Sequence, residues 1–282
     1  MGIDVSCKAS VVVVVALLPL FRMQTRSKQQ QGNQLWDAAT SGDLTRVVDI
    51  LAHCQTAMKN WADPELLRTP LYRACGHNHP AVVRELLGHP DLDVNLTSSE
   101  GATPFNVACQ QGHTEVVRLL LADPRVDINH SNEHTASPLF FTCQEDHDEV
   151  LKLLLADPSI EVNYVTKKGV TPLFIACEMG HVRVTKLLLR DRRVDINRQA
   201  NDGMTAWMAA VFSGSLEIVK FMLAARSDLV LNSHFHGHRV IDMVDSVGQK
   251  EMLEVIRGCE ADPQATRRRL RREFAFDSKI PF

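Results

Sequence analysis

Four cysteine and histidine pairs are the residues of this chain that most resemble a reactive site. Each pair has the spacing Cys-x-x-x-His, and the copies are Cys75/His79, Cys109/His113, Cys143/His147 and Cys177/His181. A single pair would suit half of a zinc site, or a thiolate activated by a neighbouring imidazole. A catalytic or metal site needs one copy, however, and these pairs recur every 34 residues. We therefore interpret them as repeated structural positions and predict no catalytic residue among them.

Three alternating histidines form a second candidate ligand set. His234, His236 and His238 would point to the same side of one extended strand, and three imidazoles are enough to hold Zn²⁺. The alternative, which we favour, is a polar loop tip that tolerates histidine. The chain also lacks a phosphate-binding glycine motif, a His-Glu-x-x-His pair and a nucleophile elbow. We therefore expect no metal ion, no cofactor and no enzymatic activity.

The elements that position these residues are short helices, most clearly in residues 169–197. Thr171 is a good capping residue, and Pro172 suits the first helical position because its missing N–H would have no partner there. The apolar residues that follow have helical spacing, and Gly180 can end the helix in the left-handed conformation. A second helix, from about Val182 to Arg190, follows directly. Two helices this short need neighbours to bury their apolar faces.

The helix-opening residue recurs at a constant interval along the chain. The series is spaced by 34 residues and comprises Thr69, Thr103, Ser137, Thr171 and Thr205. This period predicts a solenoid in which each unit contacts only its neighbours. The first unit, Asn33 to about Ala62, lacks Thr-Pro and is expected to cap the N-terminal end, followed by a weak loop near Trp61 to Leu67. A seventh unit, Gly237 to Arg257, has the polar outer face that a C-terminal cap needs.

Three features at fixed offsets resemble the ankyrin repeat over roughly residues 33–257. They are the Thr-Pro-Leu opening, the Gly-His turn and the closing Asp-hydrophobic-Asn segments at Asp93–Asn95, Asp127–Asn129 and Asp195–Asn197. The resemblance implies an all-α solenoid, an ankyrin-repeat stack of helix-turn-helix units with short β-hairpin fingers. We divide the chain into a leader (1–32), a solenoid of about seven units (33–257) and a basic tail (258–282).

One position departs from the family pattern. The family's usual histidine after Thr-Pro-Leu is replaced here by Tyr72, Asn106, Phe140, Phe174 or Met208. We therefore expect the hydrogen bond of that histidine to be absent.

The charge of the chain is unevenly distributed. There are 31 basic and 34 acidic residues, a net charge of −3, and five arginines lie between Arg267 and Arg272. Without those five, 26 basic residues face 34 acidic ones, a net charge of −8. A mildly acidic solenoid argues against nucleic acid as its ligand. We interpret the arginine run as a solvated tail, with a nuclear-import signal as the alternative. Leu270 and Phe274 have the spacing of one amphipathic turn that folds back over the seventh unit.

The cysteines indicate the redox environment. Cys75, Cys109, Cys143 and Cys177 occupy one repeat position, and equivalent atoms of stacked helices are too far apart for a disulfide. We expect them to be buried free thiols, which suit a reducing compartment, and we predict a cytoplasmic location with a nuclear one as the alternative.

The first residues carry several alternative signals. The apolar run Val11 to Leu18 is too short to span a bilayer. No small-x-small cleavage site follows it, so we disfavour a signal peptide. The segment Met1 to Ser6 fits an N-myristoylation pattern, with Cys7 as a second acylation site that would tether the protein to a membrane. We favour a disordered leader. The glycosylation sequons at Asn95 and Asn129 coincide with the residue that closes the repeat, so we interpret both as structural.

The resemblance also implies a function. Ankyrin proteins bind other proteins on a concave surface made of the finger tips and the exposed residues of the first helices. The partner-binding residues that we predict on this surface are Arg68, Gln110, Gln111, Gln144, Glu145, Lys167, Lys168, Glu178, Met179, Asn201, Asp202, Met204, Phe212 and Phe235. Its methionines and phenylalanines either anchor a partner or only contribute to packing between the repeats. We expect a monomeric, non-enzymatic scaffold or adaptor that binds another protein.

Overall fold

The structure of the chain is a computed structural model. It describes residues 29–53, 56–226, 228–231, 234–235, 238–247 and 249–274; within these ranges, side chains are described except for residues 56–57, 234–235, 238, 243 and 246–247. The predictions of a signal peptide and a lipidated N-terminus lie outside the described residues, as do residues 1–28 of the leader that we predicted to be disordered over residues 1–32.

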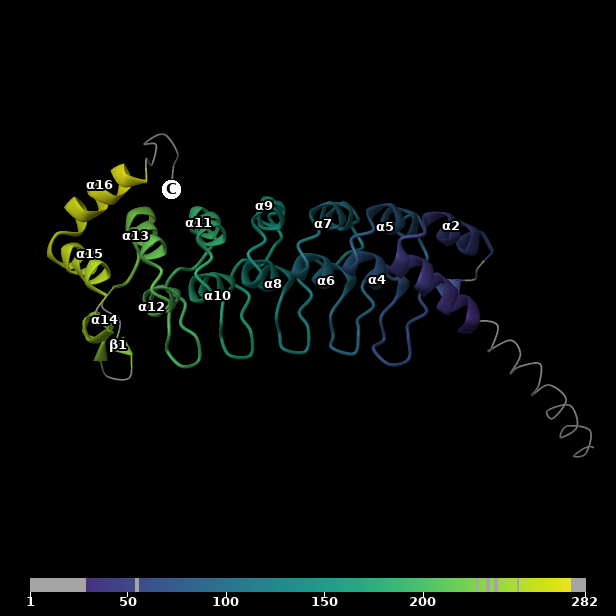
Figure 1. Cartoon of the computed structure of the whole chain (residues 1–282), viewed down its shortest axis with the longest axis horizontal. Helices are drawn as coiled ribbons and strands as arrows, with labels where there is room; N and C mark the ends of the chain where they lie inside the picture. Colours follow the sequence, from purple (N-terminus) through teal and green to yellow (C-terminus); the bar gives the residue numbers. More distant parts are fainter. Residues whose placement is uncertain are drawn as a thin grey trace, which may run out of the picture.

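The molecule is an elongated stack of helix pairs (Figure 1). One row of helices lies next to a series of projecting loops, the fingers, and we call it the inner row. It contains a helix over residues 29–41 and then α4 (Pro70–Gly76), α6 (Pro104–Gln110), α8 (Pro138–Gln144), α10 (Pro172–Glu178), α12 (Ala206–Phe212) and α14 (Val240–Val247).

The second row, the outer row, lies on the side away from the fingers (Figure 1). It contains α2 (Leu44–His53), α5 (Pro80–Leu87), α7 (Thr114–Leu121), α9 (Asp148–Ala156), α11 (Val182–Arg190), α13 (Leu216–Ala225) and α15 (Lys250–Ala261). A short helix α3 (Thr56–Lys59) follows α2, a two-stranded hairpin of β1 (His234–Phe235) and β2 (His238–Arg239) precedes α14, and α16 (Pro263–Glu273) ends the described chain. The predicted all-α solenoid is confirmed.

The predicted helix starts are confirmed by their capping geometry. Thr171 has an extended backbone, and its hydroxyl accepts a hydrogen bond from the Phe174 N–H at 3.1 Å. This bond satisfies one of the N–H groups that the first turn of a helix leaves without a partner. The same cap opens the other inner helices of the repeat at Thr69, Thr103, Ser137 and Thr205.

The turn between the two helices of a unit requires a left-handed residue. Gly112 has φ +72° and Gly180 has φ +73°, as the sequence predicts. Asn78 and Asp146 take the same conformation, each with φ +58°. Both residue types tolerate positive φ better than other side chains, so the turn survives without glycine in these two units.

The histidine of each Cys-x-x-x-His pair ties two layers together. The Nε2–H of His147 donates to the Gln110 carbonyl at 2.8 Å. The His147 ring also packs closely on Gly112, where an added Cβ would lie only 2.5 Å from the ring. Equivalent bonds run from His79 to Thr40, from His113 to Gly76 and from His181 to Gln144. The four cysteines, in contrast, are fully buried free thiols. Burial raises the pKa of the Cys177 thiol to about 12, which keeps it protonated and unreactive.

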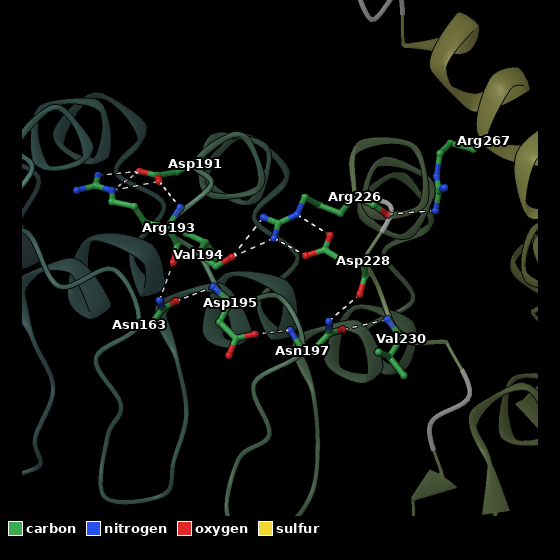
Figure 2. Close-up of polar contacts among 10 residues, drawn as sticks. All are labelled: Asn163, Asp191, Arg193, Val194, Asp195, Asn197, Arg226, Asp228, Val230 and Arg267. Atoms are coloured by element: carbon green, nitrogen blue, oxygen red, sulfur yellow. Dashed lines mark hydrogen bonds and ion pairs between the residues drawn. The ribbon is translucent and has the colours of Figure 1, made fainter. Parts of the chain in front are cut away.

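The closing asparagines form a ladder along the base of the fingers (Figure 2). The Asn163 side chain donates to the Arg193 carbonyl at 2.7 Å and accepts from the Asp195 N–H at 2.8 Å. Asn197 repeats both bonds with Asp228 and Val230 in the next layer. The same pair of bonds is made by Asn60, Asn95 and Asn129. These hydrogen bonds explain why asparagine stands at positions 95 and 129, so the two sequons need no further explanation.

The N-terminal end is better ordered than the sequence indicates. The chain is already helical from residue 29, before the predicted start at residue 33, and Gly32 packs against the Trp61 ring. The loop near Trp61 to Leu67 is a well-formed finger. Its Asp63 carboxylate accepts hydrogen bonds from the N–H groups of Glu65, Leu66 and Arg68. The carboxylate takes the place of the repeat's usual finger sequence, which is why the finger pattern is weak there.

The C-terminal arginine run is not a solvated tail. Residues 263–273 form α16, which packs against α13 and α15, and α15 continues to Ala261, beyond the predicted end of the solenoid at residue 257. Leu270 is fully buried, and the Phe274 ring packs edge-on against Phe221. Arg267 and Arg271 donate to carbonyls at the end of α13, namely those of Leu223, Ala224 and Arg226. Cations at this end of a helix satisfy free carbonyls and oppose the helix dipole.

Candidate protein-binding surface

The inner helices and the fingers present one surface along the stack. Its inner-helix part consists of the last residues of each helix and the first of the turn that follows, because these positions lie past the buried apolar stripe. Of the predicted binding residues, Gln111, Glu145, Lys167, Lys168, Glu178, Met179, Asn201, Asp202 and Phe212 are exposed, and Arg68, Gln110, Gln144 and Met204 are half-buried. Phe235 lies in β1, and its side chain is outside the described residues.

Neighbouring fingers are joined at their tips. The Ser99 N–H donates to the Leu66 carbonyl at 2.9 Å, and the Asn201 N–H donates to the Lys168 carbonyl at 3.0 Å. A third bond of this kind joins Glu133 to Glu100. These bonds fix the tip residues in a row, so a partner meets a preorganised surface and loses little affinity to ordering of the loops.

Two arginines shape the concave surface near its N-terminal end. Arg68 and Arg73 both line a hollow of about 390 Å³ that also contains Glu100, Gln110 and Gln111. This hollow combines residues of a finger with residues of two inner helices, as the predicted surface requires. The guanidinium of Arg73 lies over the Trp36 ring, 4.6 Å from its centroid, and that of Arg68 lies over Tyr72 at 5.5 Å.

The two guanidinium groups lack a carboxylate partner within ion-pair distance among the described residues. The Arg68 Nε is buried without a hydrogen-bond partner, while the Arg73 Nε donates to the Thr40 hydroxyl at 3.1 Å. Burial, and then the charge of Arg68, lower the pKa of Arg73. Tyr72 and Arg73, which line the hollow, and Trp36, which packs against Arg73, were not among the predicted site residues, because no local sequence signal distinguishes these helix positions.

The other end of the surface exposes apolar side chains. Met179 is 53% exposed and Phe212 is 39% exposed, and they occupy equivalent turns of neighbouring units. Most large apolar residues of the inner helices are buried, so these two are exceptions. Met204 differs from them, because it is half-buried and packs against the core. Its packing favours a structural role for Met204 and leaves Met179 and Phe212 as the exposed large apolar side chains at this end of the surface.

The three candidate histidine ligands do not lie along a single strand. Among the residues that the structure describes, no three His, Cys, Asp or Glu side chains are grouped in a way that would hold a metal ion. His234 and His238 lie on opposite strands of the hairpin, where Phe235 pairs with His238, so the prediction of three histidines along one extended strand is wrong. The chain reverses direction between them. The His236 position lies outside the described residues.

Asn106 contradicts the prediction that the polar contact of the family's usual histidine is missing in every unit. Its side-chain oxygen accepts from the Thr103 N–H at 2.9 Å and from the Thr103 hydroxyl, while its Nδ2 donates to the His130 carbonyl at 2.9 Å. The polar contact that we expected to be missing is therefore present in this unit. An amide carries both a donor and an acceptor, so it can substitute for an imidazole there, whereas the aromatic residues and methionine at this position in other units cannot.

The comparison with known families accounts for this architecture. The family model described as ankyrin repeats (3 copies) matches residues 35–132 and 139–233. The chain belongs to the ankyrin repeat family. Ankyrin repeats are in general modules that bind other proteins. The search of curated proteins found no match.

One further structural finding concerns membranes. In the part of the chain that the structure describes, none of the helices has both the length and the apolar character needed to cross a bilayer.

Proposed function

We propose that this ankyrin repeat protein is a non-enzymatic scaffold or adaptor that binds a partner protein across its concave surface. The exposure of Met179 and Phe212 is the observation that carries the proposal. Large apolar and aromatic side chains on an otherwise polar surface are the residues that dominate the binding energy of interfaces. Polar and charged residues on the neighbouring units, including Glu178, Asn201 and Asp202, would form the solvated rim of this contact.

The proposal includes a cytoplasmic, monomeric protein. The four buried free thiols support a reducing compartment, since a chain in an oxidising compartment would expose these cysteines to oxidation during folding. Nuclear import through the arginine run stays an alternative prediction. Two members of that run, Arg267 and Arg271, are engaged with α13, so an import receptor would have to displace them or use the other three.

Alanine at both Met179 and Phe212 tests the proposed surface. We expect partner affinity to fall by about 2 kcal/mol or more, because two anchors are truncated. The melting temperature should change much less than the affinity, since both side chains are exposed and neither belongs to the buried core. The measurement is quantitative affinity purification with mass spectrometry, followed by titration of any partner whose recovery depends on these residues.

A matched control removes the same kind of surface from the outer row. Leu44 and Val48 of α2 are 38% and 41% exposed, so Leu44→Ala with Val48→Ala deletes comparable apolar area far from the fingers. Partner recovery should be unaffected in this variant. An equal loss of partners in both variants, or a large fall in stability with Met179→Ala and Phe212→Ala, would show that these residues pad the stack instead of anchoring a partner.

A further inference from the structure

A second surface lies at the corner where outer helices end, away from the concave side. Here the ends of α11 and α13 meet α16 around a hollow of about 310 Å³. Four arginines line it, Arg190, Arg192, Arg226 and Arg271, against a single carboxylate, Asp228. That carboxylate is already paired with Arg226 at 2.8 Å (Figure 2). The hollow therefore has a marked excess of positive charge on a chain whose net charge is −3.

The repeat itself shows that the corner does not need these arginines. In the preceding layers the same turn reads Ala122-Asp123-Pro124 and Ala156-Asp157-Pro158, whereas here it reads Arg190-Asp191-Arg192. The turn is identical in all three, because the aspartate accepts the N–H of the residue two positions on, in Arg125, Ser159 and Arg193. Alanine and proline thus build the same corner as two arginines.

The equivalent hollow near the N-terminal end has a different lining. It lies between α5 and α7, with Gly88 and Pro90 at the positions of Arg190 and Arg192 and with Pro124 at the position of Arg226. Leu87 and Leu119 make most of its wall apolar, and its two arginines are both paired, Arg84 with Glu115 and Arg125 with Asp123. The hollow is therefore present in both layers, and of the two only the one at α11–α13 has arginines without a carboxylate partner among the described residues.

Three of the four arginines retain free donors that face no internal partner. Arg190 and Arg192 are exposed and make no hydrogen bond or ion pair with any residue that the structure describes. Arg271 is held in place by one bond from its Nε to the Ala224 carbonyl at 2.9 Å, and its terminal nitrogens make no further bond with the described residues. Arg226, in contrast, uses most of its donors on Asp228 and the Val194 carbonyl (Figure 2).

We propose that this arginine corner binds the phosphate group of a phosphorylated residue in a partner protein. A phosphate monoester carries nearly two negative charges and three acceptor oxygens, which match three guanidinium groups with free donors. Planar guanidinium groups bind such oxygens in bidentate fashion. A carboxylate has two oxygens and one negative charge, so it would satisfy fewer of these donors and compensate only one of the three excess positive charges.

The charge of the rest of the chain favours a phosphorylated protein over a membrane or a nucleic acid. Without the five arginines of α16 the chain carries a net charge of −8, so the excess positive charge is confined to the corner and α16, and the rest of the chain repels an extended anionic surface. A single phosphate on a flexible peptide meets only the local field, because charges beyond about 10 Å are screened at moderate ionic strength. This site does not depend on the concave surface, so either proposal can fail alone.

The chain supplies its own fold-preserving test variant. Arg190→Ala with Arg192→Pro copies the corner of the preceding layer, Ala156-Asp157-Pro158, and should leave the melting temperature unchanged or slightly higher, because proline restricts the unfolded chain. Arg183→Ala with Arg198→Ala is the control, since it removes the same charge from two exposed arginines outside the hollow. If proline perturbs the turn, Arg190→Gln with Arg192→Gln replaces it as the test variant.

The probe is a short glycine peptide with one phosphoserine, blocked at both ends, titrated into the full chain and followed by NMR of the arginine Nε–H groups. We expect saturable binding to the wild type and to the control, at least about tenfold weaker binding to Arg190→Ala with Arg192→Pro, and none of the unphosphorylated peptide. Equal weakening in the control variant, or no saturable binding to the wild type, would overturn the site. Tighter binding to phosphoinositide vesicles, lost with the same two arginines, would overturn the protein partner in favour of a lipid headgroup.

Discussion

Single side chains that satisfy backbone groups of the next layer connect the repeats. Asn197 is typical, because one amide donates to the Asp228 carbonyl at 2.8 Å and accepts from the Val230 N–H at 3.0 Å. One side-chain amide thus satisfies a backbone carbonyl and a backbone N–H that have no backbone partner in the finger. The histidines at the turns act in the same way, with one bond each to a carbonyl of the preceding unit.

Asn197→Ala should lower the free energy of unfolding by about 1 to 3 kcal/mol, since two hydrogen bonds disappear and their backbone partners must be solvated. The neighbouring Arg198→Ala is the control, because Arg198 is exposed and makes no hydrogen bond or ion pair within the described structure. Urea unfolding of the three proteins measures the difference. Equal stabilities of the two variants would mean that water replaces the two hydrogen bonds of Asn197 with no loss of free energy.

At the scale of the element, the ends of α7, α9 and α11 are organised by an aspartate and, in two of these layers, an arginine. The Nη2 of Arg125 donates to Asp123 at 2.6 Å and also to the Leu87 carbonyl, and its Nη1 donates to the carbonyls of His89 and Leu92 in the preceding unit. Arg193 forms the same ion pair with Asp191 (Figure 2) and donates in the same way to the carbonyls of Leu155, Asp157 and Pro158. One ion pair thus joins the end of a helix and the following turn to the adjacent layer.

This arrangement makes stability depend on pH through Asp123. Its hydrogen bond from Arg125 lowers the pKa of the carboxyl below the ordinary value of 3.8, although burial acts in the opposite direction. A lowered pKa in the folded state means that the stabilisation is complete above the unfolded-state pKa and is lost as the pH falls through the folded-state pKa.

Asp123→Asn should therefore cost about 2 kcal/mol at neutral pH, and the gap to the wild type should shrink below about pH 4. Urea unfolding at pH 7 and at acidic pH measures both values. A gap that does not change with pH would contradict the ionic role of the pair. Asp49→Asn in α2 provides a control for the loss of one negative charge, because the Asp49 carboxylate is exposed and makes no hydrogen bond or ion pair with a described residue.

At the scale of the whole molecule, α16 closes the end of the stack. It covers α13 with the buried Leu270, and Lys220 of α13 pairs with Glu273 at 3.1 Å and Glu251 at 3.2 Å. A solenoid has open faces at both ends, and each end must be covered for the terminal repeats to be stable. The arginine run therefore belongs to a cap, and its exposed members lie at the rim of this cap.

A chain that ends at Ala261 should lose protection mainly in α13 and α15. Each unit contacts only its neighbours, so the effect should fade along the stack and leave α5 and α7 unchanged. Hydrogen exchange resolved by peptide measures this gradient. Uniform loss of protection along the chain would contradict the nearest-neighbour description and indicate one cooperative unit.

The sequence by itself determined the repeat, the starts of the helices and the buried thiols. These features rest on local signals, namely a capping threonine, a proline at the first position and a left-handed residue at the turn, and local signals need no knowledge of distant neighbours. The predicted binding residues were also accessible by this route, because a position in the repeat fixes whether a side chain faces the core or the concave surface.

Only the tertiary structure decided how the layers are joined and what the ends do. Asn106, Arg125 and Arg271 find partners 24, 38 and 47 residues away, and nothing in their local sequence distinguishes them from solvated polar residues. The same reason explains why α16 was mistaken for a tail, since its capping contacts depend on carbonyls of α13. It also explains the arginine corner, because the four side chains come from three helix ends and meet only when those ends are stacked.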